Sequence, residues 1–244
     1  MNHKNIPSPF NNFKIISISD LHNKSFGKDN DILLNKIKKQ RPDIIVITGD
    51  LIDSYQPNLN RVYKLISKIV DIVPIYYVNG NHELRFKDYQ LFEDNLKSLG
   101  VHILNNKIVK LTREQETINL IGINDPSKYQ SLSISNDHLN KLLTQTKHAD
   151  YTILLSHRPE LMPLYKEKNI NLILSGHAHG GQIRLPFTQG LYAPNQGFFP
   201  IYTAGYFIEN DTAMVVSRGL GPSSFPLRIN NKPDLVEIIL YIEK

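Results

Sequence analysis

The sequence of 244 residues contains no cysteine. The chain therefore forms no disulfide, offers no thiolate ligand to a metal and has no cysteine nucleophile. It also lacks any apolar run approaching the ~20 residues that a membrane-spanning helix needs. These absences exclude a disulfide-stabilised domain, a zinc–thiolate site and a cysteine hydrolase, and we expect no transmembrane segment in these residues.

The opening stretch MNHKNIPSPFNN has no apolar core of the kind found in a signal peptide. We therefore expect a soluble, cytoplasmic protein, with peripheral contact at the inner face of the membrane as the alternative. The length suits a single domain over residues 1–244, with residues 1–12 as a loose N-terminal segment.

Charge and composition are those of an ordinary globular protein, with 41% hydrophobic and 21% charged residues. The net charge of +5 has two explanations. A lysine-rich surface accounts for it, and so does attraction to phosphate-bearing partners such as nucleotides, nucleic acid or anionic lipid.

Apolar periodicity predicts alternating strands and helices at the start of the chain. Residues 13–19, 43–48 and 74–78 are β-rich apolar runs, and residues 30–40 and 62–70 have the spacing of amphipathic helices. Such a β-α-β-α-β order builds a parallel sheet, because a helix carries the chain back to the start of the next strand.

The rest of the chain is less regular. We expect helices at 88–99, 136–146 and 159–168, and strands at 101–104, 107–111, 117–123, 152–156, 170–175, 213–217 and 235–242. The first three of these strands are predicted to form a meander. The expected fold class is α/β, with two sheets, one largely parallel at its centre, and helices outside.

Five of the predicted strands are followed at once by residues that bind metals or transfer protons. These residues are Asp20 and His22, Asp50, Asn81 and His82, His157, and His177 and His179. Ligands of open α/β sheets bind at the carboxyl ends of the strands. We therefore expect these side chains to converge on one edge of one sheet.

Taken singly, each of these residues has an ordinary explanation. An aspartate after a strand usually caps a helix or forms a turn, and Asn-Gly-Asn also favours a turn. Five of nine histidines at strand ends, together with two aspartates and an asparagine, are difficult to attribute to chance. The remaining four, His3, His102, His138 and His148, are assigned no role.

The types of ligand indicate two metal ions. Imidazole, carboxylate and amide oxygen without sulfur favour Mn²⁺, with Fe or Zn²⁺ as alternatives. Seven candidate ligands are too many for one ion. They suit two ions ~3.5–4 Å apart that share a carboxylate, an arrangement used for phosphoester hydrolysis.

At these residues the sequence resembles the calcineurin-like metallophosphoesterase superfamily. The signature of that superfamily, D-x-H, G-D-x-x-D, G-N-H-[DE], a lone H and G-H-x-H, is present in order between residues 20 and 179. The matching positions are Asp20-Leu21-His22, Gly49-Asp50-Leu51-Ile52-Asp53, Gly80-Asn81-His82-Glu83, His157 and Gly176-His177-Ala178-His179.

The resemblance implies a role for each matched residue. Asp20, His22, Asp50 and His179 would hold one ion, and Asn81, His157 and His177 would complete the second, with Asp50 bridging. His82 would act on the substrate phosphate rather than bind metal, and Glu83 or Asp53 would orient neighbouring groups. The family fold is an α/β/β/α sandwich with mixed sheets.

The implied activity is hydrolysis of a phosphodiester or pyrophosphate by a hydroxide that bridges the two ions. Flanking sequences such as GINDP and GHAHGGQIRLP resemble those of a bacterial subgroup related to UDP-diacylglucosamine pyrophosphohydrolases. A small phosphoester, nucleotide- or lipid-linked, is therefore the expected substrate. The alternatives are a nuclease, because of the positive charge, and a non-catalytic scaffold, although a scaffold would be expected to have lost His82 or several ligands.

The substrate itself is not specified by these motifs. Residues 186–207 are aromatic and turn-rich, and form either a packed loop or a pocket wall. Arg85, Arg184 and Arg218 could bind a second phosphate or be surface arginines. Asp125 in GINDP belongs either to the site or to a turn.

Overall fold

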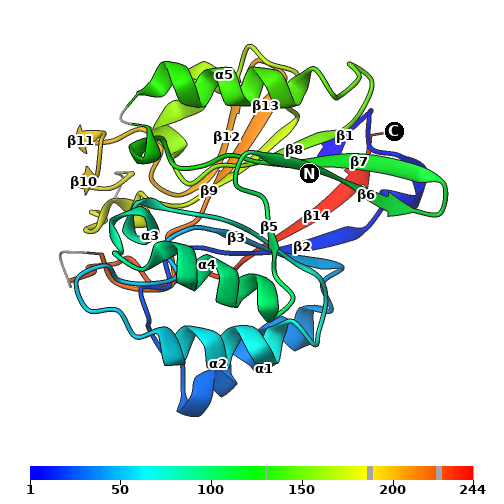
Figure 1. The fold of residues 1–244 in the computed structure, drawn as a ribbon. Helices are drawn as coiled ribbons and strands as arrows, with labels where there is room; N and C mark the ends of the chain where they lie inside the picture. The colour runs from blue at the N-terminus through cyan, green and yellow to red at the C-terminus, as the bar shows by residue number, and fades with distance from the viewer. Residues whose placement is uncertain (130, 186–188, 224–226, 244) are drawn as a thin grey trace.

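Two facing β-sheets with helices on both outer faces make up the computed structural model of this chain (Figure 1). The structure describes residues 1–129, 131–185, 189–223 and 227–243. The layers follow the order helix, sheet, sheet, helix, as expected for an α/β/β/α sandwich with mixed sheets. In the described residues, no helix has the length and apolar character needed to cross a bilayer.

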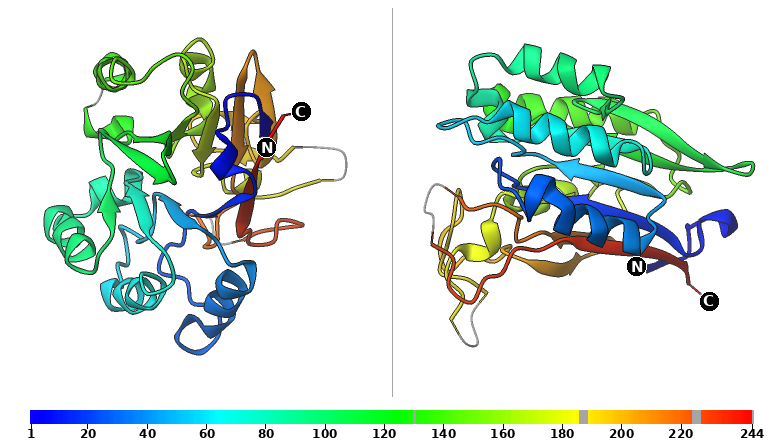
Figure 2. Two further views of the ribbon diagram at one scale, coloured as in Figure 1. Left: turned by 90° about the vertical axis from the view of Figure 1, so that its right-hand side faces the viewer. Right: turned by 90° about the horizontal axis from the view of Figure 1, so that it is seen from below.

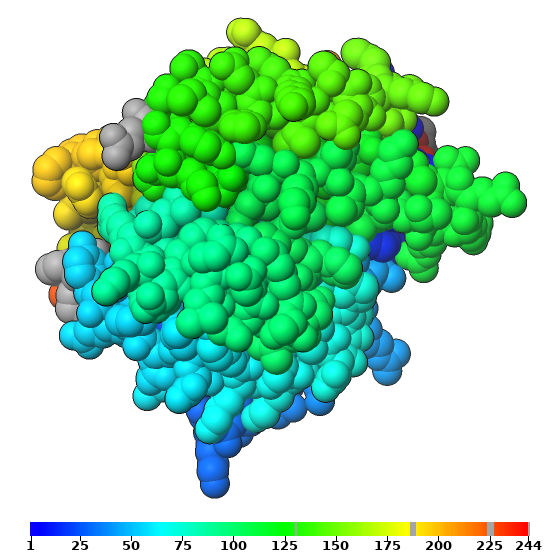
Figure 3. Space-filling model, in the orientation of Figure 1, coloured from blue at the N-terminus to red at the C-terminus, as the bar shows by residue number. Residues whose placement is uncertain are grey.

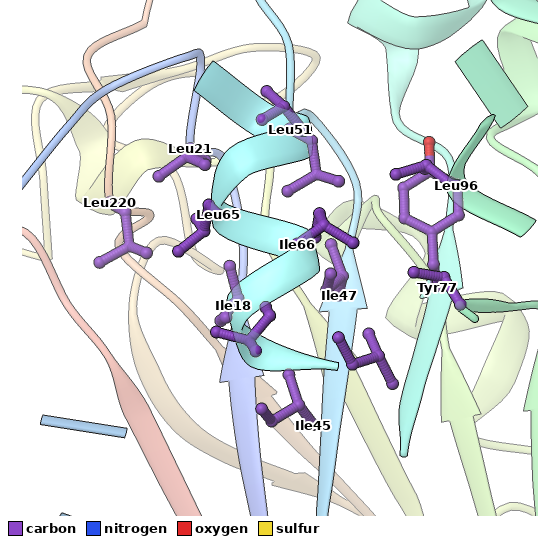
Figure 4. Close-up of a cluster of buried hydrophobic side chains, with 14 of the residues drawn as sticks. Ile18, Leu21, Ile45, Ile47, Leu51, Leu65, Ile66, Tyr77, Leu96 and Leu220 are labelled. Carbon is purple, nitrogen blue, oxygen red and sulfur yellow. The ribbon is translucent and has the colours of Figure 1, made fainter. Parts of the chain in front are cut away.

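The first sheet has the order β1-β14-β2-β3-β4-β5, and β2 to β5 run parallel. Its strands are β1 (Asn2–His3), β14 (Val236–Ile242), β2 (Phe13–Ile18), β3 (Ile44–Thr48), β4 (Ile75–Val78) and β5 (His102–Ile103). The outer face of this sheet packs against α1 (Asp31–Gln40), α2 (Leu59–Ile69) and α4 (Tyr89–Ser98). Figure 4 shows Leu65 and Ile66 of α2 packed toward Ile18 and Ile47 of the sheet.

The second sheet has the order β12-β13-β9-β8-β7-β6. Its strands are β12 (Gly205–Glu209), β13 (Thr212–Val216), β9 (Leu172–Ser175), β8 (Thr152–Leu155), β7 (Glu116–Gly122) and β6 (Lys107–Arg113). Its outer face packs against α5 (Leu132–Leu143) and α6 (Met162–Tyr165). The strand β12, the one-turn helix α3 (Asn81–Arg85) and the hairpin of β10 (Tyr192–Ala193) and β11 (Gly197–Phe198) were not predicted.

The central strands are buried on both faces, which explains their unbroken apolar sequences. In β3, Val46 packs between the two sheets, whereas its neighbours Ile45 and Ile47 pack against the helices. Side chains of Val78, Leu120 and other residues complete the core between the sheets.

The expected meander of three strands is wrong. The strand β5 pairs in parallel with β4 in the first sheet, whereas β6 and β7 form an antiparallel hairpin in the second. The chain crosses between sheets around Leu104, where a Cβ atom on Gly122 would collide with Leu104. Periodicity identifies strands but does not show which sheet each one joins.

The N-terminal segment is not loose. Residues 2–3 pair with the C-terminal strand β14, and the side chains of Ile6 and Phe10 are buried. The two termini consequently lie together, at the end of the molecule opposite the β10–β11 hairpin (Figures 1 and 2). Residues 1–12 are mostly polar, so the sequence alone did not indicate that Ile6 and Phe10 are core residues.

We predict that Phe10→Ala lowers the free energy of unfolding by about 3–5 kcal/mol, because Phe10 is 1% exposed in the core between the sheets. Urea denaturation followed by circular dichroism measures this change. The matched control is Phe198→Ala, at a side chain that is 71% exposed, which should change stability by less than about 0.5 kcal/mol. Equal effects of the two substitutions would contradict the packing described for residues 1–12.

Candidate metal centre

The predicted site residues meet at one end of the sandwich, but they come from both sheets. Asp20, Asp50 and Asn81 follow β2, β3 and β4 of the first sheet, whereas His157 and His177 follow β8 and β9 of the second. This end of the molecule carries α3 and the β10–β11 hairpin (Figure 1). The expectation of a single sheet edge is therefore corrected, because facing sheets bring two sets of strand ends together.

One group of candidate ligands consists of Asp20, His22 and His179, all buried. The Nε2 atoms of His22 and His179 are 3.3 Å apart, and His179 Nε2 is 3.5 Å from Asp20 Oδ1. Ser19 Oγ and the His177 backbone N–H both donate hydrogen bonds to the Asp20 carboxylate. The group presents one oxygen and two nitrogens to a common point.

A second group consists of Asp50, Asn81, His157 and His177. His157 Nε2 lies 3.3 Å from Asp50 Oδ2, 3.2 Å from Asn81 Oδ1 and 3.1 Å from His177 Nδ1. The two groups meet at Asp50, because its Oδ2 atom is also 3.7 Å from His22 Nε2. The structure thus brings all seven predicted ligands together, with Asp50 between the two groups.

A hydrogen bond on the far side of the His157 imidazole suits this site to cations. His157 Nδ1 is 2.8 Å from the Thr48 carbonyl oxygen, which can only accept, so Nδ1 carries the proton. Once a cation displaces the proton from Nε2, the lone pair of that atom faces Asp50 and Asn81. Oxygens and nitrogen lone pairs that converge in a buried space, without sulfur, are a donor set for divalent cations such as Mn²⁺, Fe²⁺ or Zn²⁺.

The backbone at these residues is strained. Positive φ angles, a region that side chains other than glycine seldom adopt, occur at Asp20 (49°), His22 (46°), Asp50 (53°), His177 (65°) and His179 (47°). Each such residue costs of the order of 1 kcal/mol or more unless it is stabilised by its surroundings. Strain concentrated at five of the seven candidate ligands is typical of a functional site.

Two glycines leave room for the carboxylates. A Cβ atom on Gly80 would collide with Asp50 Oδ1, and one on Gly176 would collide with Ser19 and Asp20. The glycines in the G-N-H and G-H-x-H motifs are therefore required by close approach of the backbone to the carboxylates.

Burial and mutual attraction shift the pKa values of the candidate ligands. Burial raises the pKa of Asp20 to about 6 and lowers the pKa of His22 to about 4. Burial opposes a charge on His157 too, but the adjacent Asp50 carboxylate prevails and raises the pKa of His157 to about 10. Without metal, protons therefore occupy part of the site.

His82 has a different environment from the seven ligands. Its Nδ1 atom accepts a hydrogen bond from the Ser54 backbone N–H at 3.1 Å, and its ring lies edge-on to His22 with centroids 4.5 Å apart. Burial lowers the pKa of His82, so the neutral ring is favoured. With Nδ1 as the acceptor, Nε2 carries the proton and can donate a hydrogen bond.

Of the two acidic residues predicted to orient neighbours, Glu83 has the closer connection to the site. Its buried carboxylate accepts from the backbone N–H groups of Gly80, Asp50 and Ile52, which fixes the loops after β3 and β4. Asp53 Oδ1 accepts from Tyr55 N at 2.8 Å in a turn and lies 4.0 Å from His82 Nδ1.

A cavity of about 590 Å³ adjoins the site. Asp50, Asn81, His82, His177 and His179 line one side, and the apolar Ile183, Leu191, Tyr192, Pro194 and Phe198 line another. The described part of the segment 186–207 thus contributes a pocket wall, and the β10–β11 hairpin within it projects at the edge of the molecule in Figure 3. Residues 186–188 of that segment lie outside the described residues.

The three candidate arginines have different positions. Arg85 lines the cavity. The Arg184 guanidinium donates to the Gly180 carbonyl and to Thr203 Oγ1, which is a structural role. Arg218 is not among the described residues that line the cavity.

Sequence reasoning missed Arg158, Asn195 and Arg228. Arg158 Nε and Nη2 donate to the Asp125 carboxylate, and Asn195 Oδ1 is 2.9 Å from His177 Nε2. Arg228 Nη2 lies 3.2 Å from His179 Nδ1 and adds positive charge beside the site. The position of Arg158 directly after His157 was a usable signal, whereas Asn195 and Arg228 stand in no recognisable motif.

The family model for the calcineurin-like phosphoesterases matches residues 13–181. Among curated proteins, the metallophosphoesterase YkuE of Bacillus subtilis is 30% identical over 96% of this chain and 81% of its own. The phosphodiesterase YaeI of Escherichia coli is 26% identical over 93% of this chain and 82% of its own. A dimetal phosphatase structure from Danio rerio, 12% identical, superposes with a TM-score of 0.58 and covers 95% of this chain and 93% of that one.

The chain belongs to the calcineurin-like phosphoesterase family. The fold expected from that resemblance is confirmed by the sandwich described above.

We predict that metal binding releases protons, because a cation must displace the proton from His157, whose pKa is raised to about 10. Asp20, with a pKa of about 6, is also protonated in more acidic solution, so affinity should fall and proton release rise as the pH is lowered. Calorimetric titration of Mn²⁺ at about pH 8 and about pH 5.5, in buffers of different ionisation enthalpy, measures the protons released. An apparent binding enthalpy that does not depend on the buffer would contradict the prediction.

Proposed function

We propose that this protein is a dinuclear metal-dependent phosphoesterase that hydrolyses phosphodiester or pyrophosphate bonds. The observation that carries the proposal is the position of Asp50 Oδ2, 3.3 Å from His157 Nε2 and 3.7 Å from His22 Nε2. One carboxylate oxygen shared by two groups of ligands is suited to bridge two cations. The relative YaeI of Escherichia coli, which is named a phosphodiesterase, supports the proposed preference for diesters.

The proposed ligands divide into two sets. Asp20, His22 and His179 would hold one ion and Asn81, His157 and His177 the other, with Asp50 shared. The chemistry that two bound divalent cations supply is neutralisation of phosphoryl oxygens and acidification of a water molecule. Mn²⁺ is the proposed metal, since the donors combine imidazole with oxygen ligands.

His82 is the proposed catalytic residue. Its neutral ring, with Nδ1 engaged by Ser54, keeps an N–H at Nε2, and the side chain lines the cavity beside Asp50 and Asn81. An N–H donor there can stabilise charge on the phosphate and on the leaving oxygen by a hydrogen bond, which typically contributes about 10²–10³-fold to the rate.

The cavity wall suggests which phosphoesters fit. Leu191, Tyr192 and Phe198 provide apolar and aromatic surface within the same cavity as the proposed ligands. Such a wall favours a substrate with an apolar or aromatic substituent on phosphorus. Arg85, on the same cavity, is placed to meet a second anionic group.

Metal restoration tests the function directly. Protein stripped with a chelator should regain turnover of bis-p-nitrophenyl phosphate when Mn²⁺ is added, and should hydrolyse p-nitrophenyl phosphate more slowly. Release of p-nitrophenol measures both rates, with Zn²⁺, Fe²⁺ and Mg²⁺ compared in parallel. Turnover of the monoester alone would replace the phosphodiesterase proposal by a phosphatase, and full activity after stripping would refute metal dependence.

Two substitutions separate ligand from catalyst. His82→Ala should keep two ions but lose about 10²–10³-fold in kcat, because only the hydrogen-bond donor is removed. Asp50→Asn should lose metal occupancy as well, because it removes the shared carboxylate. Metal analysis and kinetics measure the two effects, with His102→Ala, an exposed histidine of β5, as the control. An empty site in His82→Ala would show that His82 is a ligand.

A further inference from the structure

A chain of polar contacts leads from the interior to the outer side of His177. Asp125 accepts from Arg158 through both oxygens, with Nε to Oδ2 at 2.6 Å and Nη2 to Oδ1 at 3.0 Å. Arg158 Nη1 then donates to Asn195 Oδ1 at 2.7 Å, and the same oxygen lies 2.9 Å from His177 Nε2.

We propose that Asp125, Arg158 and Asn195 form a positioning relay that holds the His177 imidazole with its Nδ1 lone pair directed at the metal centre. The inference rests on the proposed two-ion site. It assigns a function to three residues that lie outside the metal-binding motifs.

The chemistry of each contact permits only one arrangement. A guanidinium has no acceptor, so the Asn195 atom that faces Arg158 must be the amide oxygen and not the nitrogen. That oxygen accepts, so His177 Nε2 must carry the proton that it shares with Asn195. The lone pair of His177 is then on Nδ1, the atom 3.1 Å from His157 Nε2.

The base of the relay is rigid. The Asp125 side chain is fully buried and the Arg158 side chain is 11% exposed, so the ion pair between them is sheltered from water. Bidentate carboxylate–guanidinium pairs fix orientation as well as distance. Asp125 also accepts from Ser127 N–H, as expected for a residue that begins a turn. In the proposed relay it therefore belongs both to a turn and to the surroundings of the site.

The outer member of the relay belongs to the substrate side of the site. Asn195 lies in the turn of the β10–β11 hairpin, and the two strands of that hairpin carry the cavity residues Tyr192 and Phe198. Its φ angle of 62° is in the left-handed region, where asparagine, aspartate and glycine are tolerated best. The relay therefore ties the hairpin of the pocket wall to a proposed metal ligand.

The test uses Asn195→Gly, which suits the backbone angle and removes the acceptor. We expect one of the two Mn²⁺ ions to bind about 10–100-fold more weakly, as is typical when the hydrogen-bond partner of a metal ligand is removed, while the other ion is retained. Asn195→Asp keeps the acceptor oxygen and should restore affinity. The matched control is Asn210→Gly, a left-handed asparagine in the turn between β12 and β13, which should bind as wild type.

A double-mutant cycle tests whether the residues act as one unit. Arg158→Lys keeps the positive charge but loses the bidentate contact with Asp125, so it should weaken binding of the same ion. Combining it with Asn195→Gly should cause little further loss of affinity. Calorimetric titration of Mn²⁺ into stripped protein gives both affinities. Wild-type affinity in Asn195→Gly, or full additivity of the two effects, would overturn the relay alone. A wild-type protein that takes up no second ion would overturn the proposed function as well.

Discussion

The buried carboxylate of Asp50 is the constraint around which the loops of this site are arranged. One of its oxygens accepts from the His82 backbone N–H at 2.9 Å, and the other faces His22 and His157. Burial disfavours its charge, yet attraction to His157 holds the pKa of Asp50 well below its ordinary value. A buried carboxylate that stays ionised needs a cationic partner, which is the protonated His157 imidazole in the absence of metal and would be a bound cation in its presence.

Holding so many polar groups together requires a stiff support. Five candidate ligands have left-handed backbone angles, and residues beside them in the same loops, Leu21, Leu51 and Ala178, are buried in the apolar core. The compensation comes from the strands beneath, which are buried on both faces between the helices and the second sheet. Because those strands cannot shift without disturbing two cores, the strained turns at their ends remain in place.

The strands and motifs of the site were accessible from sequence, because both depend on local patterns. Short unbroken apolar runs located β2, β3, β4, β8 and β9, and the polar residues after each run were the ones that converge. Sheet membership was not accessible, since it depends on contacts between residues distant along the chain. The sequence therefore predicted which residues meet but placed them on one sheet, and it grouped β5 with a hairpin that belongs to the other.

Asn195 and Arg158 are hard to identify from motifs for a different reason, although Arg158 directly follows the motif residue His157. Neither binds a metal in the proposed scheme, so neither needs the spacing that makes ligands recognisable, and each acts through the hydrogen bond it makes to another side chain. Asn195 follows His177 by 18 residues and reaches it only because the hairpin folds back over the end of β9. The residues that orient ligands are consequently fixed by tertiary structure, whereas the ligands themselves are fixed by strand ends. A change in the pocket wall can for this reason reach the metal centre without touching any residue of the family motifs.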